Sequence, residues 1–332
     1  MTGLNETPAR VTPEPILRIS AGYMAAKLLF VASRIGLFEA LAQGPRTAAQ
    51  LGTAVAVPAR SARIVADAMV SVGLVSRDGD EYRNTPVAQT FLAGVTPADR
   101  RPILRSWDQI SYPTWQRLEA AVRTGEPQVE PLSPADQAVL ALGMEVSTGD
   151  TASVLPSRYS FAAHQRLLDL GGGTGSFAHA ALEQNPHLSA TLFELPQTAA
   201  VAAQRVDGLA NRERLDIVEG DLFIDPIPKD HDVLLLANVV HLFSPERSRT
   251  LLGRVREAAP DGSRLLLVDL WTDPTHTDPS FAALIAGEFL LVGGGHAYSV
   301  EEVAELLTDA GWQFDEHRPL VGPSSLVLAT AG

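Results

Sequence analysis

A glycine-rich segment in the middle of the chain constrains its fold more strongly than any other feature. The segment Leu168-Asp169-Leu170-Gly171-Gly172-Gly173-Thr174-Gly175 follows an apolar run and precedes a helical pattern. Glycines at a strand-to-helix junction let the backbone turn sharply and approach a ligand closely. Taken alone, the segment is also compatible with a plain tight turn.

The glycine spacing narrows the class of ligand. Gly171, Gly173 and Gly175 form a G-x-G-x-G pattern behind the acidic Asp169. Dinucleotide-binding loops follow G-x-G-x-x-G/A, and Ser176 stands at the last position of that pattern. The sequence contains no G-x-x-x-x-G-K-[ST] pattern, which excludes a P-loop. A dehydrogenase built on a dinucleotide fold is therefore disfavoured.

From Arg166 onward, strand-like and helix-like segments alternate. This alternation predicts an α/β fold, with a parallel sheet covered by helices on both faces. Helices are expected over 245–258 and 300–310, among others. A stretch at 312–319 predicts a terminal antiparallel hairpin with the last strand. The other expected strands span residues 166–170, 190–195, 215–218, 233–237, 265–270 and 325–329.

The N-terminal half has a different, mainly helical pattern. Residues 1–15, which contain three prolines, are expected to be flexible, and residues 16–100 to form a winged-helix domain. Residues 75–83 predict the two-strand wing. A helical linker over 101–160 that contributes to a substrate pocket, and a ligand-binding domain over 161–332, complete the expected organisation.

Two more acidic residues fall at the ends of expected strands. Glu194 ends the second strand, about twenty residues past the glycine loop, where a carboxylate can accept hydrogen bonds from both ribose hydroxyls. Asp221 follows the third strand, where it can bond an adenine amino group while the apolar Leu222 packs on the ring. Each feature alone is ordinary. With the glycine loop, they predict a nucleoside-binding site.

Composition limits the partners and the location. Lys and Arg number 26 and Asp and Glu number 39, so a net charge of −13 repels nucleic acid and anionic membranes on average. The absence of cysteine excludes disulfides and thiolate catalysis. Neither a signal-peptide pattern nor an apolar run of about 18 residues is evident. We therefore expect a cytoplasmic protein without nucleic-acid or membrane partners.

The motifs together resemble the class I small-molecule methyltransferases, in particular plant caffeate-type and bacterial antibiotic-biosynthesis O-methyltransferases. In the C-terminal half the resemblance rests on Asp169–Gly175, Glu194-Leu195-Pro196, Gly220-Asp221-Leu222-Phe223 and Asn238-Val239-Val240-His241. In the N-terminal half, three segments are similar to the winged-helix dimerisation domain of that family: Gly36-Leu37-Phe38, Gly73-Leu74-Val75 and Tyr82-Arg83-Asn84-Thr85.

The resemblance implies a Rossmann-like seven-strand sheet, a homodimer, and S-adenosylmethionine as the methyl donor. Its cofactor-binding residues carry over to Asp169, Gly171 and Gly173 at the methionine part, Glu194 at the ribose, Asp221 and Leu222 at the adenine, and Asn238 beyond the fourth strand.

His241 matches the catalytic base of that family, which takes a proton from the acceptor hydroxyl. Where the family has His-Asp-Trp, this chain has His241-Leu242-Phe243. Asp269 stands where the first of two orienting glutamates belongs, and His296 stands at or near the second. The favoured function is O-methylation of a small specialised metabolite, with His241, Asp269 and His296 as catalytic candidates.

The two histidines leave an alternative open. His241, His296 and a carboxylate from Asp269 or Glu288 would make a facial site for a divalent metal ion. Such an ion would stabilise the enolate of a 2-oxo acid, and the methyl group would go to its β-carbon. The plainer interpretation of His296 is a polar residue that lines the pocket.

The substrate pocket is expected to be walled by Trp107, Tyr112, Met144, Glu288 and Phe289, although ordinary core packing would use the same residue types.

The winged-helix pattern also leaves open a ligand-sensing DNA-binding regulator, with Arg60 and Arg63 at the start of the recognition helix. An almost even charge balance over residues 1–100 disfavours this alternative.

Overall fold

The structure is a computed structural model that describes residues 11–332. The expectation of a flexible stretch over 1–15 therefore lies mostly outside the described residues. Within them, helix α1 (Glu14–Ser20) already begins at Glu14. Pro15 stands in the first turn of this helix, where a missing N–H costs no hydrogen bond. The chain folds into two compact units that divide between Asp108 and Gln109.

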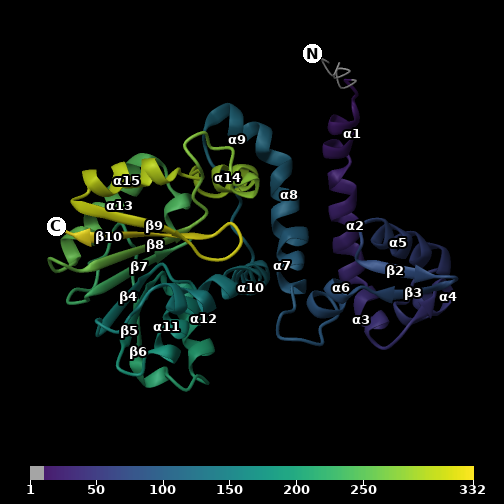
Figure 1. Ribbon diagram of the computed structural model, residues 1–332, viewed down its shortest axis with the longest axis horizontal. Helices are drawn as coiled ribbons and strands as arrows, with labels where there is room; N and C mark the ends of the chain where they lie inside the picture. The colour runs from purple at the N-terminus through teal and green to yellow at the C-terminus, as the bar shows by residue number, and fades with distance from the viewer. Residues whose placement is uncertain (1–10) are drawn as a thin grey trace, which may run out of the picture. The chain divides into compact units, whose positions relative to one another are not determined.

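The N-terminal unit is mainly helical around a small three-strand sheet of order β1-β3-β2 (Figure 1). The expected two-strand wing is present, since β2 and β3 pair antiparallel from Val75↔Asn84 to Asp78↔Glu81. Its remaining elements are α2 (Gly22–Arg34), α3 (Leu37–Ala42), β1 (Arg46–Thr47), α4 (Ala48–Ala54), α5 (Ala59–Ser71), β2 (Val75–Asp78), β3 (Glu81–Asn84), α6 (Pro86–Phe91) and α7 (Arg101–Ser106).

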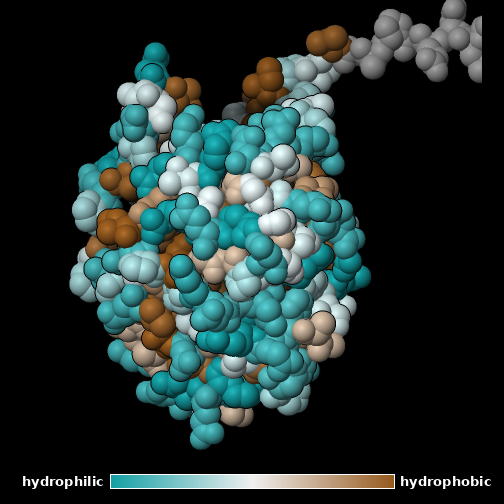
Figure 2. Space-filling view, turned by 90° about the vertical axis from the view of Figure 1, so that its left-hand side faces the viewer, coloured by the Kyte–Doolittle hydropathy of each residue, from teal (hydrophilic) through white to brown (hydrophobic). Residues whose placement is uncertain are grey.

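One helical stretch of this unit is apolar and exposed. Residues Glu14–Arg34 contain an 18-residue window with a mean hydropathy of 1.4, of which 11% is buried. By length and composition alone this stretch could cross a membrane, which corrects the expectation that no segment reaches that length. Arg18 interrupts the run of apolar residues, but the mean hydropathy of the window remains high. Ile16, Leu17 and Ile19 are 71%, 61% and 78% exposed, and apolar side chains are visible beside the grey residues in Figure 2.

The C-terminal unit opens with helices and continues into a seven-strand sheet. A π-helical turn (Trp107–Ser111) crosses the division between the units. Short helices and one long helix follow: α8 (Tyr112–Thr114), the 3-10 turn η2 (Trp115–Arg117), α9 (Leu118–Thr124) and α10 (Pro134–Arg158).

The sheet has the order β6-β5-β4-β7-β8-β10-β9. Its first five strands run parallel, and β10 pairs antiparallel with both β8 and β9, which confirms the expected fold class and its terminal hairpin. The strands are β4 (Arg166–Leu170), β5 (Ser189–Glu194), β6 (Leu215–Glu219), β7 (Val233–Ala237), β8 (Arg264–Asp269), β9 (Trp312–Pro319) and β10 (Ser325–Ala331).

Helices cover both faces of this sheet, and a separate hydrophobic cluster fills each interface (Figure 1). All five residues of β7 are buried, as expected for a central parallel strand with an unbroken apolar sequence. The covering helices are α11 (Ser176–Gln184), α12 (Pro196–Val206), α13 (Pro245–Ala258) and α15 (Val300–Asp309). The unit also contains α14 (Ser280–Gly293), which packs against α9, and the 3-10 turns η3 (Arg212–Arg214) and η4 (Val240–Leu242).

Strand order fixes where a ligand can bind. The chain moves from β4 outward to β5 and β6, then returns to β7 on the other side of β4. The loops after β4 and β7 therefore diverge and leave a crevice at the carboxyl ends of these strands. The expected cofactor-binding residues lie at this edge, in the last two residues of β4 or β5 or in the segments directly after β4, β6 and β7.

Candidate active site

The glycine loop after β4 needs its glycines. Gly171, Gly173 and Gly175 have φ values of +67°, +61° and +82°, in the left-handed region that favours glycine. A Cβ atom on Gly171 would also lie 3.1 Å from a methyl group of Val239 and 3.5 Å from Leu222 Cδ1. The loop is thus packed between the turns that follow β6 and β7, with no room for a side chain at Gly171.

Asp169 lies beneath this loop and is fully buried. Its Oδ2 accepts a hydrogen bond from the Ala178 N–H at 3.2 Å, whereas its Oδ1 has no partner. A Cβ on Gly172 would come within 2.5 Å of this carboxylate, so Gly172 closes over it. Burial is the main cause that raises the pKa of Asp169 to about 7.

Glu194 ends β5 and faces the same loop. Its Oε2 accepts a hydrogen bond from the Gly173 N–H at 2.9 Å, and its Oε1 accepts one from the Leu195 N–H at 2.8 Å. Burial raises the pKa of Glu194 above its ordinary value. The structure therefore brings Glu194 and Gly173 together, as a shared cofactor site requires.

Asp221 and Leu222 lie beside the glycine loop. Asp221 Oδ1 accepts a hydrogen bond from the Phe223 N–H at 2.7 Å, and the Asp221 N–H donates to Asp225 Oδ2 at 2.8 Å. These bonds fold the loop after β6 into a tight turn. Leu222 Cδ1 would lie 3.5 Å from a Cβ atom added to Gly171, so Leu222 lies next to the glycine loop.

Asn238 follows β7 in a left-handed conformation, with φ of +57°. Among residues other than glycine, asparagine tolerates this conformation best. The Asn238 N–H still donates to the Val268 carbonyl at 2.8 Å, so the backbone turns out of the sheet directly after this bond. The turn leads into η4, which carries His241.

His241 and Asp269 form a buried pair across the ends of β7 and β8. His241 Nδ1 lies 2.6 Å from Asp269 Oδ1, and the backbone N–H of His241 donates to Oδ2 at 3.4 Å. Asp269 Oδ1 also accepts the Leu270 N–H at 2.8 Å. An ionised carboxylate only accepts, so Nδ1 carries a hydrogen, and in the neutral imidazole Nε2 has the lone pair. This is the tautomer that a general base needs.

Phe289, on α14, lies flat on the imidazole. The two ring centroids are 3.8 Å apart with an interplanar angle of 19°. The neighbouring Glu288 Oε2 accepts a hydrogen bond from Ser111 Oγ at 2.8 Å and another from Trp115 Nε1. The Trp115 ring packs on Gly287, where a Cβ would lie 3.1 Å from it. Phe289, one of the expected pocket residues, is thus in contact with His241.

The segment with His296 passes directly against the catalytic turn. A Cβ on Gly295 would lie 2.0 Å from the His241 carbonyl oxygen. The His296 ring lies 4.1 Å from the ring of Tyr298, and burial lowers the pKa of His296. The backbone is therefore close to His241, while the imidazole of His296 packs beside Tyr298.

The expected donors do not assemble a metal site. Among the described residues, 11–332, no group of three or more His, Asp or Glu side chains is arranged to hold a metal ion. Asp269 is engaged by His241, and Glu288 by Ser111 and Trp115. The facial triad of the alternative hypothesis, and with it His241 and His296 as metal ligands, is therefore not supported by this geometry.

The other expected pocket residues are placed on helices. Trp107 belongs to the N-terminal unit, at the start of the π-helical turn. Tyr112 begins α8, and Met144 lies on α10 with 44% of its surface exposed. Their contribution to a substrate pocket stays a prediction.

Sequence patterns missed several residues that support the catalytic turn. The Tyr298 hydroxyl donates to the Phe243 carbonyl at 2.7 Å and lies 3.0 Å from Ser248 Oγ, which in turn bonds the Val240 carbonyl. Burial raises the pKa of Tyr298 to about 12. These contacts depend on residues far apart in the sequence, so no local pattern marks them.

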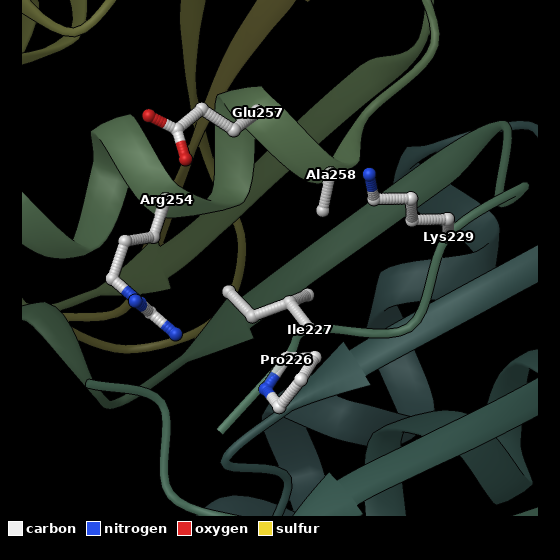
Figure 3. Close-up of a pocket in the computed structure, with 6 residues that line it drawn as sticks. All are labelled: Pro226, Ile227, Lys229, Arg254, Glu257 and Ala258. Atoms are coloured by element: carbon white, nitrogen blue, oxygen red, sulfur yellow. The ribbon is translucent and has the colours of Figure 1, made fainter. Parts of the chain in front are cut away.

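A shallow pocket elsewhere on this unit is separate from the site. It is lined by Pro226, Ile227, Lys229, Arg254, Glu257 and Ala258 (Figure 3). None of the expected site residues contributes to it.

Comparison with known families decides the assignment. Residues 115–313 match the O-methyltransferase domain, and residues 17–94 match the O-methyltransferase dimerisation domain. The chain belongs to the O-methyltransferase family. It is an S-adenosylmethionine-dependent enzyme, which confirms the predicted family, activity and cofactor. The winged-helix pattern belongs to the dimerisation domain, so the DNA-binding alternative loses its basis.

Known relatives extend over almost the whole O-methyltransferase. A 3-hydroxy-5-methyl-1-naphthoate 3-O-methyltransferase of Streptomyces sahachiroi is 29% identical, with 93% of this chain and 92% of that protein covered. The N,N-dimethyltransferase OxyT of Streptomyces rimosus is 30% identical, with 90% of each covered. The structure of human N-acetylserotonin methyltransferase in complex with S-adenosylmethionine superposes with a TM-score of 0.86 at 24% identity, over 98% of this chain and 99% of that one.

Proposed function

We propose that this enzyme methylates a hydroxyl oxygen of a small aromatic molecule, with His241 as the general base. The observation that carries this proposal is the buried His241–Asp269 pair, whose 2.6 Å hydrogen bond leaves Nε2 as the free basic nitrogen. A base with this tautomer can take the proton from a hydroxyl as its oxygen attacks the methyl group.

The cofactor supplies a methyl group on a positively charged sulfur. As the acceptor oxygen attacks, its proton passes to Nε2 of His241. Asp269 stabilises the imidazolium through Nδ1, and Phe289 keeps the imidazole plane fixed by lying against it. Much of the rate acceleration comes from holding sulfur, methyl carbon and oxygen in line.

Different residues at the carboxyl edge of the sheet would bind different parts of the cofactor. Glu194 would accept hydrogen bonds from the ribose hydroxyls. Asp221 and Leu222 would bind the adenine, and the backbone of the glycine loop with Asn238 would line the methionine part. The support is their common position at the ends of four strands, the hydrogen bond from the Gly173 N–H to Glu194, and the closeness of Leu222 to Gly171, where an added Cβ would lie 3.5 Å from Leu222 Cδ1.

The acceptor class is suggested by the relatives. One methylates the 3-hydroxyl of a naphthoate, and another acts on N-acetylserotonin. An aromatic hydroxylated metabolite also suits an imidazole whose one face is covered by a phenyl ring. We further propose a cytoplasmic homodimer formed through residues 17–94, a range that includes the last four residues of the exposed apolar helix α1.

The test is a screen of hydroxylated naphthoates, phenols and aryl amines with a cofactor that carries a deuterated methyl group. Mass spectrometry and NMR of the products locate the label. A label on a phenolic oxygen supports the proposal. A label only on carbon or nitrogen would overturn it, and the OxyT relative makes nitrogen the first competing atom to check.

A further inference from the structure

Two arginines on α13 contact the loop after β6, next to the proposed cofactor site. Arg247 and Arg254 are seven residues apart, so they lie on the same side of the helix, two turns from each other. Neither forms an ion pair to an acidic side chain among the interactions that the structure records for them. Instead, both contact the loop that follows β6 and carries Asp221.

Arg254 holds the backbone of that loop. Its Nε donates to the Leu222 carbonyl at 2.8 Å, and an Nη atom donates to the Asp225 carbonyl at 2.6 Å. Figure 3 shows this side chain extending from α13 along one side of the shallow pocket. The two bonds span the turn, so they fix the position of Leu222 and Asp221 relative to the helix.

Arg247 joins the same loop to the catalytic turn. Its guanidinium carbon lies 4.2 Å from the ring centroid of Phe223 and 5.4 Å from that of Phe243. The two phenyl rings meet edge to face, with centroids 4.9 Å apart. An arginine over an aromatic face is attracted to it, and here one cation covers both rings.

Each of the two phenylalanines is close in sequence to a proposed functional residue, and a hydrogen bond holds its backbone in place. The Phe223 N–H donates to Asp221 Oδ1 at 2.7 Å, so displacement of Phe223 displaces that carboxylate. Phe243 follows His241 by two residues, and its carbonyl is fixed by the Tyr298 hydroxyl at 2.7 Å. The contacts therefore run from Asp221 through Phe223 and Phe243 to the turn that carries His241.

We propose that α13 sets the position of the adenine-binding loop relative to the catalytic base, with Arg254 and Arg247 as the two positioning residues. Neither touches the reacting atoms. Methyl transfer needs the acceptor oxygen, methyl carbon and sulfur in line, and that alignment depends on a fixed spacing between the cofactor and His241. This inference rests on the roles proposed above for Asp221 and His241.

The test compares Arg247→Met, Arg254→Met and Arg247→Lys with Arg249→Met as the matched control. Arg249 lies on the same helix but is paired with Asp309. Calorimetric titration with S-adenosylhomocysteine should show weaker binding, about two- to fivefold for Arg247→Met and about fivefold or more for Arg254→Met. Arg247→Lys should restore most of the loss because the cation remains, and Arg249→Met should bind as the wild type does.

Amide hydrogen exchange measures whether cofactor binding affects the catalytic turn, and it needs no acceptor substrate. Binding of S-adenosylhomocysteine should slow exchange in residues 240–244 of the wild type, and Arg247→Met should lose most of that protection when measured at saturating ligand. Unchanged protection in Arg247→Met would overturn the proposed connection. So would equal effects of Arg249→Met and Arg247→Met on binding, since that would show general helix destabilisation.

Turnover separates this inference from the proposed function. If His241→Ala keeps its activity, His241 is not the general base. The binding and hydrogen-exchange results still test whether Arg247 and Arg254 position the loop after β6. If His241→Ala is inactive and Arg247→Met binds and exchanges like the wild type, the positioning role alone fails.

Discussion

His241 Nδ1 and Asp269 Oδ1 lie 2.6 Å apart, and both side chains are almost fully buried. The pair joins a 3-10 turn after β7 to the last residue of β8, two strands that are neighbours in the sheet. Parallel pairing thus brings together two residues 28 positions apart in the sequence. The proposed base is oriented by the sheet itself and not by a flexible loop.

Replacement of Asp269 by asparagine should lower kcat about 10²-fold or more, because the amide can donate to Nδ1 and stabilise the wrong tautomer. Affinity for S-adenosylhomocysteine should change less than threefold. Steady-state kinetics and calorimetry measure the two effects. Asp273→Asn is a suitable control because Asp273 follows the same strand but accepts hydrogen bonds from its own turn, from Thr277 and Asp278. An Asp269→Asn enzyme with wild-type kcat would contradict the orienting role.

Replacement of Phe289 by leucine should lower kcat about three- to tenfold by releasing the imidazole plane. Phe289→Tyr should retain most of the activity because it keeps the stacked ring. Kinetics of both variants with the same acceptor would show this. Equal losses in the leucine and tyrosine variants would contradict a role for the stacked ring.

The stability of the cofactor-free protein should depend on Asp169 between about pH 4 and pH 7. Folding raises the pKa of Asp169 from 3.8 to about 7, so the folded state binds the proton more tightly than the unfolded state. Stability is therefore greatest below the unfolded pKa and falls as pH rises toward 7, by at most about 1.4 kcal/mol per pH unit.

Denaturant unfolding at pH 4, 5, 6 and 7 measures this dependence. Asp169→Asn should lose less stability than the wild type over the same interval. Parallel curves for the two proteins would show that Asp169 is not protonated in the folded state. The comparison between the two proteins removes the contribution of Glu194, whose pKa is also raised.

Replacement of Gly171 by alanine should abolish measurable cofactor binding and destabilise the fold by about 1–2 kcal/mol, because φ is +67° and a methyl of Val239 lies 3.1 Å from the added carbon. Gly149→Ala is the matched control, since Gly149 lies in α10 with nothing within 4 Å of the added atom. That variant should bind normally. Normal binding by Gly171→Ala would place the cofactor elsewhere.

Replacement of Ile19 by glutamate should weaken the proposed homodimer, because Ile19 is 78% exposed on α1 within the matched dimerisation region. Light scattering after size exclusion should show a shift toward monomer at micromolar concentration. Val201→Glu is the control, as Val201 is 43% exposed on α12 of the catalytic unit. An unchanged mass for Ile19→Glu would show that α1 is not part of the interface.

Local sequence patterns predicted the sheet well. The strands 166–170 and 233–237 and the helix 245–258 begin and end where the structure has them, because apolar runs and the alternation of strand and helix patterns are local signals. The start of α1 was not predicted, because proline is common both in loops and in the first turn of a helix, and the sequence alone does not separate the two.

Contacts between distant segments could not be predicted in the same way. The sequence placed His241 and Asp269 at one edge, but the stacking of Phe289, the turn of Glu288 toward Trp115 and the contacts of Arg247 arise only from packing of α13 and α14. The geometry does not support the metal alternative for the same reason. It required His241, His296 and one carboxylate, from Asp269 or Glu288, to converge, whereas each of these side chains has its own partner.

The most direct test of general-base catalysis by His241 is the turnover of His241→Ala with a hydroxylated acceptor that the wild type methylates. We expect kcat to fall about 10²- to 10⁴-fold while cofactor affinity is retained, because the base is lost and the cofactor site is not. Near-normal turnover by His241→Ala would contradict general-base catalysis by this residue.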